Sequence, residues 1–442
     1  MKKGCGAAVG KTNCRLRVRR VLAALLCLVM GSVLCGCGAP SPGETALTPS
    51  PPLLTPLPEK TGLRIAVASD THLDPDNTDK SLGVETVYNM EILDAMLRDA
   101  REQGAELLLI TGDLCNSGKA NKHAALTEKL RAAEAEGLTV CVLPGNHDLG
   151  PLRQMEFAGF YAAFGYDEAF SRDTASLSYC VLRDELMILM MDTGGYAAGA
   201  IDLPGAATRD NNEAFLSETT LRWAEELLRK AEAEKTPVIA AGHYNLLPEI
   251  SRQPGSGYYV ENGERFAALL RRYDVPLYLS GHMHLRAVYR EDRLTEQLTE
   301  CLIAYPTGYT VLDLDGDALR VSPRRVDVAA WAAETEQSDP VLLDFAAWQE
   351  QAQYSYCRAT AEAMAARNPI PERDLQVAVD FFYRVMRAYW DGSLPARQDE
   401  LRIHPGYAPF FRCAEGYSYG WWLKDLIETA SPLLPGYTLP SS

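Results

Sequence analysis

The sequence has no pair of cysteines separated by two residues, although its 442 residues include eleven cysteines. Five of these lie within the first 37 residues, and the other six are scattered: Cys115, Cys141, Cys180, Cys301, Cys357 and Cys413. The lack of CxxC pairs excludes a zinc ribbon. The pattern leaves one or two disulfides open without assigning them, and we expect most of the six thiols to be small core side chains.

The chain is also short of positive charge, with 43 basic against 59 acidic residues and a formal net charge of −16. Seven of the basic residues and none of the acidic ones lie in residues 1–36, so the remainder is more acidic still. Such a surface repels nucleic-acid backbones and anionic lipid, so we expect no nucleic-acid partner. A small phosphate substrate stays compatible with it, because bound cations reverse the potential at one site.

The apolar run at residues 21–34 is too short to cross a bilayer as a mature helix. It follows a basic stretch without acidic residues, which is typical of a secretory signal. The run ends in LCGC (residues 34–37), which resembles a bacterial lipobox. We therefore predict a signal peptide over residues 1–36 and a lipid on Cys37, which would hold the protein on the outer face of the cell membrane. The alternative is an ordinary signal peptide with an unused cysteine.

Residues 37–60 are rich in proline, serine and threonine and show no hydrophobic periodicity. Prolines favour extended conformations, so this segment should act as a semi-stiff tether. Beyond it, the sequence shows two successive patterns of predicted secondary structure. An alternating pattern of strands and helices covers residues 61–325, and a helical pattern covers residues 326–442. We expect two folded domains with these limits.

Short apolar runs and helical stretches alternate in the first of these domains. We predict strands at residues 63–69, 106–111, 138–144, 176–182, 185–192, 236–242, 275–281, 309–315 and 318–323. We predict helices between them at residues 85–103, 119–136 and 218–234. Continuous apolar strands followed by helices indicate an α/β domain whose sheet is buried on both faces.

The second domain is predicted to be helical at residues 339–367, 371–390 and 415–429. Its last part is rich in aromatic residues, which could form a sugar-stacking surface. We favour the simpler interpretation that they pack this helical subdomain onto the α/β domain. Their positions are Tyr407, Phe410, Phe411, Tyr417, Tyr419, Trp421 and Trp422.

Polar residues gather at the ends of the predicted strands, where α/β domains bind ligands. Five of the seven histidines lie there, and only His123 and His404 lie elsewhere. Random placement would not produce this pattern. The blocks are SDTH (69–72), TGD (111–113), PGNHD (144–148), GH (242–243) and GHMH (281–284).

The blocks DxH, GD, GNHD, GH and GHxH, in this order, resemble the signature of the calcineurin-like metallophosphoesterase superfamily. Each block alone is weak, but five in order at strand ends are specific. The resemblance covers residues 63–325. It implies a two-sheet αββα sandwich that hydrolyses a phosphate monoester or diester, and the spacing is most similar to the cyclic-nucleotide phosphodiesterase branch.

The resemblance implies seven ligands for two metal ions. Asp70, His72 and His284 would bind the first ion, Asp113 would bridge both, and Asn146, His243 and His282 would complete the second site. Oxygen and nitrogen ligands suit Mn, Fe or Zn and do not select among them. Two such ions would activate water and hold phosphate oxygens. In this family pattern His147 would protonate the leaving group, and Asp148 would orient His147.

Two further residues are candidates for substrate binding. Arg286 follows the last block and could hold a phosphate, although a surface or strand-pairing role fits it equally well. Asn116 follows the GD block, where a turn residue is the commoner explanation. A silent lipoprotein that binds a partner through its helical subdomain is the alternative to an enzyme. Every ligand position is filled, which argues against that alternative, and the sequence identifies no protein partner.

Overall fold

The computed structural model describes residues 62–78, 86–196, 200–203, 213–248, 257–315, 318–429 and 438–440. The predicted signal peptide, Cys37 and the tether all lie outside these residues. Within the described part of the chain, no helix is both long and apolar enough to cross a membrane. All six cysteines downstream of the tether are buried and free, so none of them forms the disulfide that the sequence left open.

The first sheet has six strands among the described residues, in the order β13-β12-β11-β1-β2-β3. They are β1 (Arg64–Ala68), β2 (Leu107–Thr111), β3 (Thr139–Leu143), β11 (Gly308–Asp315), β12 (Ala318–Arg325) and β13 (Thr438–Pro440). Strands β1, β2 and β3 are parallel, with Ile65 opposite Leu107 and Leu107 opposite Thr139. The other pairs are antiparallel. Every residue of β1 and β2 is buried, as expected for strands covered on both faces.

The second sheet has seven strands in the same described ranges, in the order β4-β5-β6-β7-β8-β10-β9. They are β4 (Ser171–Arg172), β5 (Tyr179–Arg183), β6 (Leu186–Met191), β7 (Val238–Gly242), β8 (Leu277–Ser280), β9 (Ala287–Glu291) and β10 (Leu294–Leu298). Strands β6, β7, β8 and β10 run parallel to their neighbours in that series. Both sheets are therefore mixed: the parallel strands form one end of the first sheet and the centre of the second.

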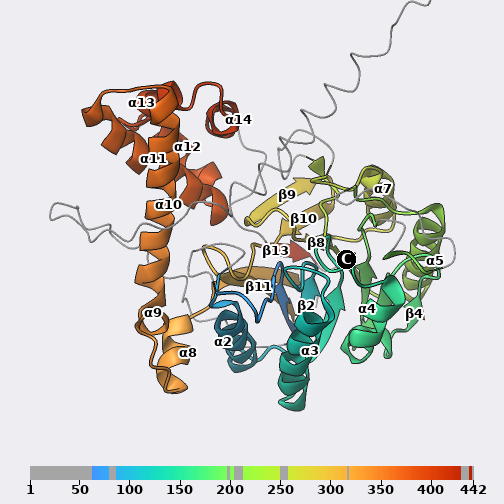
Figure 1. Ribbon diagram of the computed structural model, residues 1–442. Coiled ribbons are helices and arrows are strands. Elements are labelled where there is room, and N and C mark those ends of the chain that lie inside the picture. The colour runs from blue at the N-terminus through green and yellow to red at the C-terminus, as the bar shows by residue number, and fades with distance from the viewer. Residues whose placement is uncertain are drawn as a thin grey trace, which may run out of the picture. The chain divides into compact units, whose positions relative to one another are not determined.

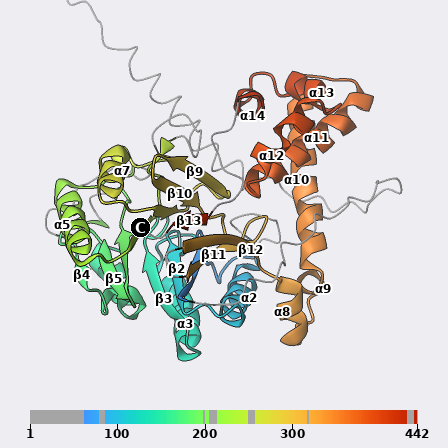
Figure 2. The ribbon, with the colours of Figure 1, turned by 180° about the vertical axis from the view of Figure 1, so that it is seen from behind.

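Helices lie beside each sheet (Figures 1 and 2). Helices α2 (Asn89–Glu102) and α3 (Ala120–Ala135) accompany the first sheet, and α5 (Glu218–Glu234) and α7 (Gly263–Arg272) accompany the second. Side chains of β6 alternate between two cores. Ile188 and Met190 share a core with the first sheet, whereas Met187 and Leu189 share one with α5 and α7. The order helix, sheet, sheet, helix confirms the predicted αββα fold.

All nine predicted strands form, but the prediction missed four others among the described residues, of which β10 is the most instructive. Its sequence LTEQL is polar at Glu296 and Gln297, yet the whole strand is buried. The Glu296 carboxylate accepts hydrogen bonds from the Ser280 hydroxyl at 2.7 Å and from the Leu247 N–H at 2.8 Å. Partners from distant segments satisfy this buried group, and no local pattern announces them.

The region after β12 is helical, as predicted. It contains α8 (Val328–Glu334), α9 (Pro340–Leu343), α10 (Phe345–Arg367), α11 (Glu372–Trp390), α12 (Leu394–Arg402), α13 (Tyr407–Cys413) and α14 (Ser418–Glu428). Phe382 and Phe410 stack with ring centroids 4.9 Å apart in its core. The region is not helical to its end, because residues 438–440 pair with β12 of the first sheet.

Two shorter helices follow β3, namely α4 (Gln154–Phe160) and the π-helix η1 (Ala162–Tyr166). Both escaped the sequence prediction because each spans fewer than two α-helical turns, too short for a hydrophobic period to show. Phe157 of α4, Phe164 of η1 and Tyr161 between them lie in the core between the sheets, and none of these three side chains is exposed.

Candidate metal centre

The candidate ligands follow five strands whose ends meet at one edge of the two sheets. From the first sheet come Asp70 and His72 after β1, Asp113 after β2 and Asn146 after β3; from the second come His243 after β7 and His282 and His284 after β8. Carboxyl ends of parallel strands are where α/β folds place ligands. The structure brings all seven side chains together there.

The backbone at this edge is unusual. Positive φ angles occur at Asp70 (53°), His72 (37°), Asp113 (48°), His282 (70°) and His284 (55°). Such a conformation is uncommon outside glycine and costs about 1–3 kcal/mol at each residue. Five of the seven candidate ligands share it, so the chain turns sharply just after β1, β2 and β8. Strain concentrated in this way is typical of a functional site.

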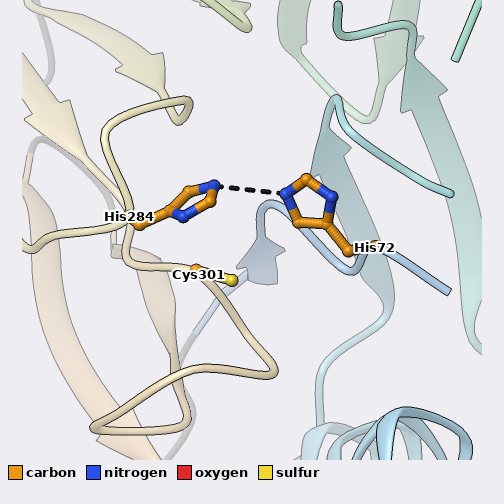
Figure 3. Close-up of side chains that lie close together, drawn as sticks. All are labelled: His72, His284 and Cys301. Carbon is orange, nitrogen blue, oxygen red and sulfur yellow. Dashed lines mark hydrogen bonds between the residues drawn. The ribbon is translucent and has the colours of Figure 1, made fainter. Parts of the chain in front are cut away.

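One group of donors surrounds the carboxylates of Asp70 and Asp113. Nε2 of His72 lies 3.1 Å from Nε2 of His284, and Figure 3 shows the two imidazoles facing each other. Oδ1 of Asp70 lies 3.3 Å from His284 Nε2. Oδ2 of Asp113 lies 3.7 Å from His72 Nε2. These four side chains offer donor atoms within 4.8 Å of one another.

A second group shares Asp113 with the first. Oδ2 of Asp113 lies 3.4 Å from Nε2 of His243. Oδ1 of Asn146 lies 3.0 Å from His243 Nε2 and 3.0 Å from His282 Nδ1. Asp113, His243 and His282 again place donor atoms within 4.8 Å of one another. Two adjacent groups of ligands with one carboxylate in common is the arrangement of a two-metal centre.

Glycines allow the two sheets to approach at this edge. A Cβ on Gly281 would lie 1.8 Å from the Ser69 hydroxyl and 2.7 Å from Oδ2 of Asp70. A Cβ on Gly112, whose φ is +94°, would lie 2.5 Å from Nδ1 of His243. Any larger residue at either position would push a candidate ligand out of place, which explains the glycines that precede Asp113 and His282.

Burial and charge shift the titration of these groups in opposite directions. Burial lowers the pKa of His72 to about 3, against the attraction of the Asp113 carboxylate. Burial would also lower the pKa of His243, but the charge of Asp113 and its hydrogen bond raise that pKa to about 9. Burial disfavours ionisation of Asp70, yet the adjacent imidazole of His284 holds its pKa at about 2. Opposed shifts among neighbours are typical of functional sites.

The residues present fit two metal ions. Oδ1 of Asp70 is buried and has no hydrogen-bond partner among the described residues, although it lies among imidazole nitrogens. The facing Nε2 atoms of His72 and His284 have room for only one proton between them. A cation would satisfy the carboxylate oxygen and both nitrogens. The donors are nitrogen and oxygen, which suits Mn, Fe or Zn.

His147 differs from the ligands in being accessible, since 42% of its side chain is exposed. Its backbone N–H donates to Oδ1 of Asp113 at 2.8 Å, and its Nε2 lies 4.0 Å from Oδ2 of the same residue. Its Nδ1 lies 3.4 Å from the carbonyl oxygen of Asn116. The ring therefore stands beside the two groups of ligands with one nitrogen free to meet a substrate.

The orienting role predicted for Asp148 is wrong. Its carboxylate is fully buried and accepts backbone N–H groups of Leu114 at 3.0 Å, Cys115 at 2.9 Å and Gly145 at 2.8 Å. Asp148 thus joins the loops after β2 and β3. The Asn116 carbonyl oxygen contacts Nδ1 of the His147 ring instead. A main-chain contact of this kind leaves no signal in the identity of the residue.

The structure also contradicts a substrate contact by Arg286. Its side chain is buried and forms a bidentate ion pair with Glu300, in which Nε lies 3.0 Å from Oε2. A guanidinium held in this way cannot turn toward a phosphate at the site without leaving a buried carboxylate unpaired.

Sequence reasoning missed Cys301. Its thiol is buried, donates to the carbonyl oxygen of Asp70 at 3.1 Å and lies with His72 and His284 in a further group of donor atoms within 4.8 Å (Figure 3). No block surrounds Cys301 in the sequence, so no signal could have identified it. It reaches the site because it forms an isolated parallel bridge with Ser69.

Residues 63–286 match the calcineurin-like phosphoesterase family, and residues 327–428 match the C-terminal domain of cyclic nucleotide phosphodiesterase. No curated protein matches the chain by sequence. Among solved structures, a dimetal phosphatase from Danio rerio is 12% identical with a TM-score of 0.48, and the match covers 60% of this chain and 97% of that one. A purple acid phosphatase from yellow lupin (Lupinus luteus) seeds is 14% identical with a TM-score of 0.43, covering 63% and 53%.

The assignment rests on the first family match, since both structural likenesses have TM-scores below 0.5. That match spans just over half of the 442 residues and contains all seven candidate ligands. The chain therefore belongs to the calcineurin-like phosphoesterase family and is a metal-dependent phosphoesterase.

Proposed function

We propose that the protein hydrolyses a phosphodiester with two metal ions held by the seven side chains of the centre. Asp70, His72 and His284 would hold one ion, Asn146, His243 and His282 would hold the other, and Asp113 would contribute to both sites. The observation that carries this proposal is that Asp113 belongs to both groups of donor atoms. When bound, two such ions supply an activated water and neutralise charge on the phosphate.

In this proposal His147 protonates the leaving alkoxide. It is the accessible histidine beside the ligands, and the Asn116 carbonyl oxygen accepts a hydrogen bond from its Nδ1. Nε2 is then the nitrogen that faces the substrate. A donor in this position lowers the barrier most for leaving groups that are poor acids.

Two observations favour a diester over a monoester. The helical region matches the C-terminal domain of cyclic nucleotide phosphodiesterase. Arg286, the cation next to the last ligand block, is already paired with Glu300 and does not offer its charge to the second negative charge of a monoester. We further propose that the enzyme works on the outer face of a bacterial membrane, attached by a lipid on Cys37 and the tether.

The test of the chemistry uses the purified full-length protein in detergent. Metal analysis should give two equivalents of Mn, Fe or Zn per chain. The protein should hydrolyse bis(4-nitrophenyl) phosphate faster than 4-nitrophenyl phosphate at equal concentration. One equivalent or less would remove the two-metal assignment, and a faster monoester would remove the preference for diesters.

The attachment is tested separately with Cys37→Ser. In a bacterial host the wild-type protein should sediment with membranes, and the variant should be released, because residues 38–60 are polar and proline-rich and cannot hold a bilayer. Cys35→Ser is the matched control, since it removes a neighbouring thiol that is not the predicted lipid acceptor. A Cys37→Ser protein that stays with membranes would contradict the lipid anchor.

A further inference from the structure

The loop after β8, residues 281–286, lies against the helical region. It carries His282 and His284. The neighbouring side chains of Met283 and Leu285 pack against the core of the helical region. The N–H of Arg286 donates to the carbonyl oxygen of Trp390, the last residue of α11, at 3.0 Å. The end of α11 is therefore joined directly to the loop that holds two ligands.

A second loop, residues 299–307, also reaches from the ligands to the helical region. At one end Cys301 donates to the Asp70 carbonyl oxygen at 3.1 Å, and the N–H of Leu302 donates to the Ser69 carbonyl oxygen at 3.0 Å. At the other end the Tyr305 hydroxyl accepts a hydrogen bond from Arg387 of α11 at 2.8 Å. One loop thus links the backbone of Asp70 to α11.

A buried ion pair joins these two loops to each other. Arg286 ends the first loop, and Glu300 lies near the start of the second; both are buried, and their contact is bidentate. Gly392, which follows α11, lies directly against Arg286: a Cβ on it would come within 2.8 Å of the Arg286 carbonyl oxygen. Any shift of α11 would therefore move both loops together.

The backbone at the ligands needs this support. His284 and Asp70 have φ angles of 55° and 53°, a conformation that persists only when the surroundings impose it. For His284 those surroundings are Met283, Leu285 and Arg286, all in contact with the helical region. For Asp70 they include the loop that ends at Tyr305.

We propose that the helical region is a positioning element for the metal ion held by Asp70, His72 and His284, and that it sets the affinity of the protein for that ion. The inference rests on the ligand roles given under the proposed function. Groups that orient metal ligands typically change metal affinity by about 10- to 100-fold when they are altered. The region that matches the family domain, residues 327–428, would then contribute to the chemistry by positioning metal ligands.

Two glycines of the helical region provide a matched test. Gly392 and Gly416 have similar positive φ angles of 74° and 79°, so alanine imposes the same backbone penalty at both. A Cβ at Gly392 would press on Arg286, whereas a Cβ at Gly416 would meet nothing within 4 Å. Gly392→Ala therefore disturbs the ligand loop, and Gly416→Ala controls for loss of helical stability.

The readouts are metal content after dialysis and the metal concentration that gives half-maximal activity, both on the full-length protein. We expect Gly392→Ala to retain one ion and to need at least about 10-fold more metal, with kcat recovered at saturating metal. Gly416→Ala should melt earlier but keep the wild-type metal dependence. A purely structural defect lowers the active fraction at every metal concentration and leaves the half-maximal concentration unchanged.

A second pair of variants tests the same inference if Gly392→Ala fails to fold. Glu300→Gln removes the charge that holds Arg286 and keeps the shape of the side chain. Asp313→Asn does the same to the buried Arg64–Asp313 pair, which joins β1 to β11 and touches neither ligand loop. We expect weaker metal binding in Glu300→Gln alone.

The outcomes separate this inference from the proposed function. If wild-type protein holds two ions, and both Gly392→Ala and Glu300→Gln keep the wild-type metal dependence, the inference fails and the proposed function stands. If wild-type protein binds fewer than two ions, both fail together.

Discussion

The two halves of the metal centre are held in different ways. On one side, Nδ1 of His243 lies 2.9 Å from the Thr111 carbonyl oxygen and Nε2 of His282 lies 2.8 Å from the Gly257 carbonyl oxygen. Each imidazole therefore has a partner on the nitrogen that does not face Asn146. On the other side, Nδ1 of His72 is buried and finds no hydrogen-bond partner in the part of the chain that the structure describes.

The difference shows that ligand identity alone does not define a metal site. A carbonyl oxygen behind an imidazole fixes its tautomer and its direction before the ion arrives. His243 and His282 have this preparation from carbonyl oxygens of the α/β domain, although His282 shares the loop after β8 with His284. The half with His72 and His284 depends on loops that the helical region supports. We therefore expect the half with His243 and His282 to bind its ion more tightly than the half with His72 and His284.

The largest expected effect is the loss of both halves of the metal centre in one variant. Asp113→Ala deletes the carboxylate shared by both halves, so both ions should be lost and hydrolysis should fall to background. Metal analysis and the rate with bis(4-nitrophenyl) phosphate check this. The exposed aspartate Asp76, changed to alanine, should alter neither measurement. Two retained equivalents in Asp113→Ala would show that the bridge is misassigned.

The next effect concerns a residue that adjoins the centre without belonging to either half. His147→Ala should keep both ions and lose about 10²- to 10⁴-fold in rate on substrates with poor leaving groups. Esters of acidic phenols need little help from a proton donor, so their loss should be much smaller. Rate against leaving-group pKa, with metal content measured in parallel, checks both statements.

Asp148→Asn sharpens the same experiment. Because Asp148 accepts three backbone N–H groups from the loops after β2 and β3, its loss should slow all leaving groups equally and lower the melting temperature. An equal loss across leaving groups in His147→Ala, or loss of an ion, would remove His147 from the acid role.

The smallest expected effect is the difference between the affinities of the two halves for their metal ions. Competition with a chelator should release the two ions in separate steps that differ by about 10-fold in affinity. His284→Ala should remove the weaker step and keep the tighter one. A single release step, or loss of the tighter step in His284→Ala, would mean that the carbonyl partners of His243 and His282 do not govern affinity.

Much of the fold was predictable because its strands are continuous apolar runs. Burial of β1 and β2 on both faces requires such runs, and an apolar run can be recognised from the local sequence alone. β10 escaped because Glu296 is buried against partners that lie far away in the sequence. The roles of Asp148 and Arg286 were mispredicted for the same reason, since Glu300 and two of the three backbone groups that Asp148 binds lie on other loops.

The sequence alone determined which residues could bind metal and that they would follow strand ends. It does so because the required donors, the glycines before them and the apolar runs are local and leave a local pattern. Only the tertiary structure decided that Asp113 is shared, that Cys301 lies under Asp70 and that α11 supports the loop with His284. Those facts depend on the approach of segments far apart in the chain, and packing between two sheets and a helical region sets that approach.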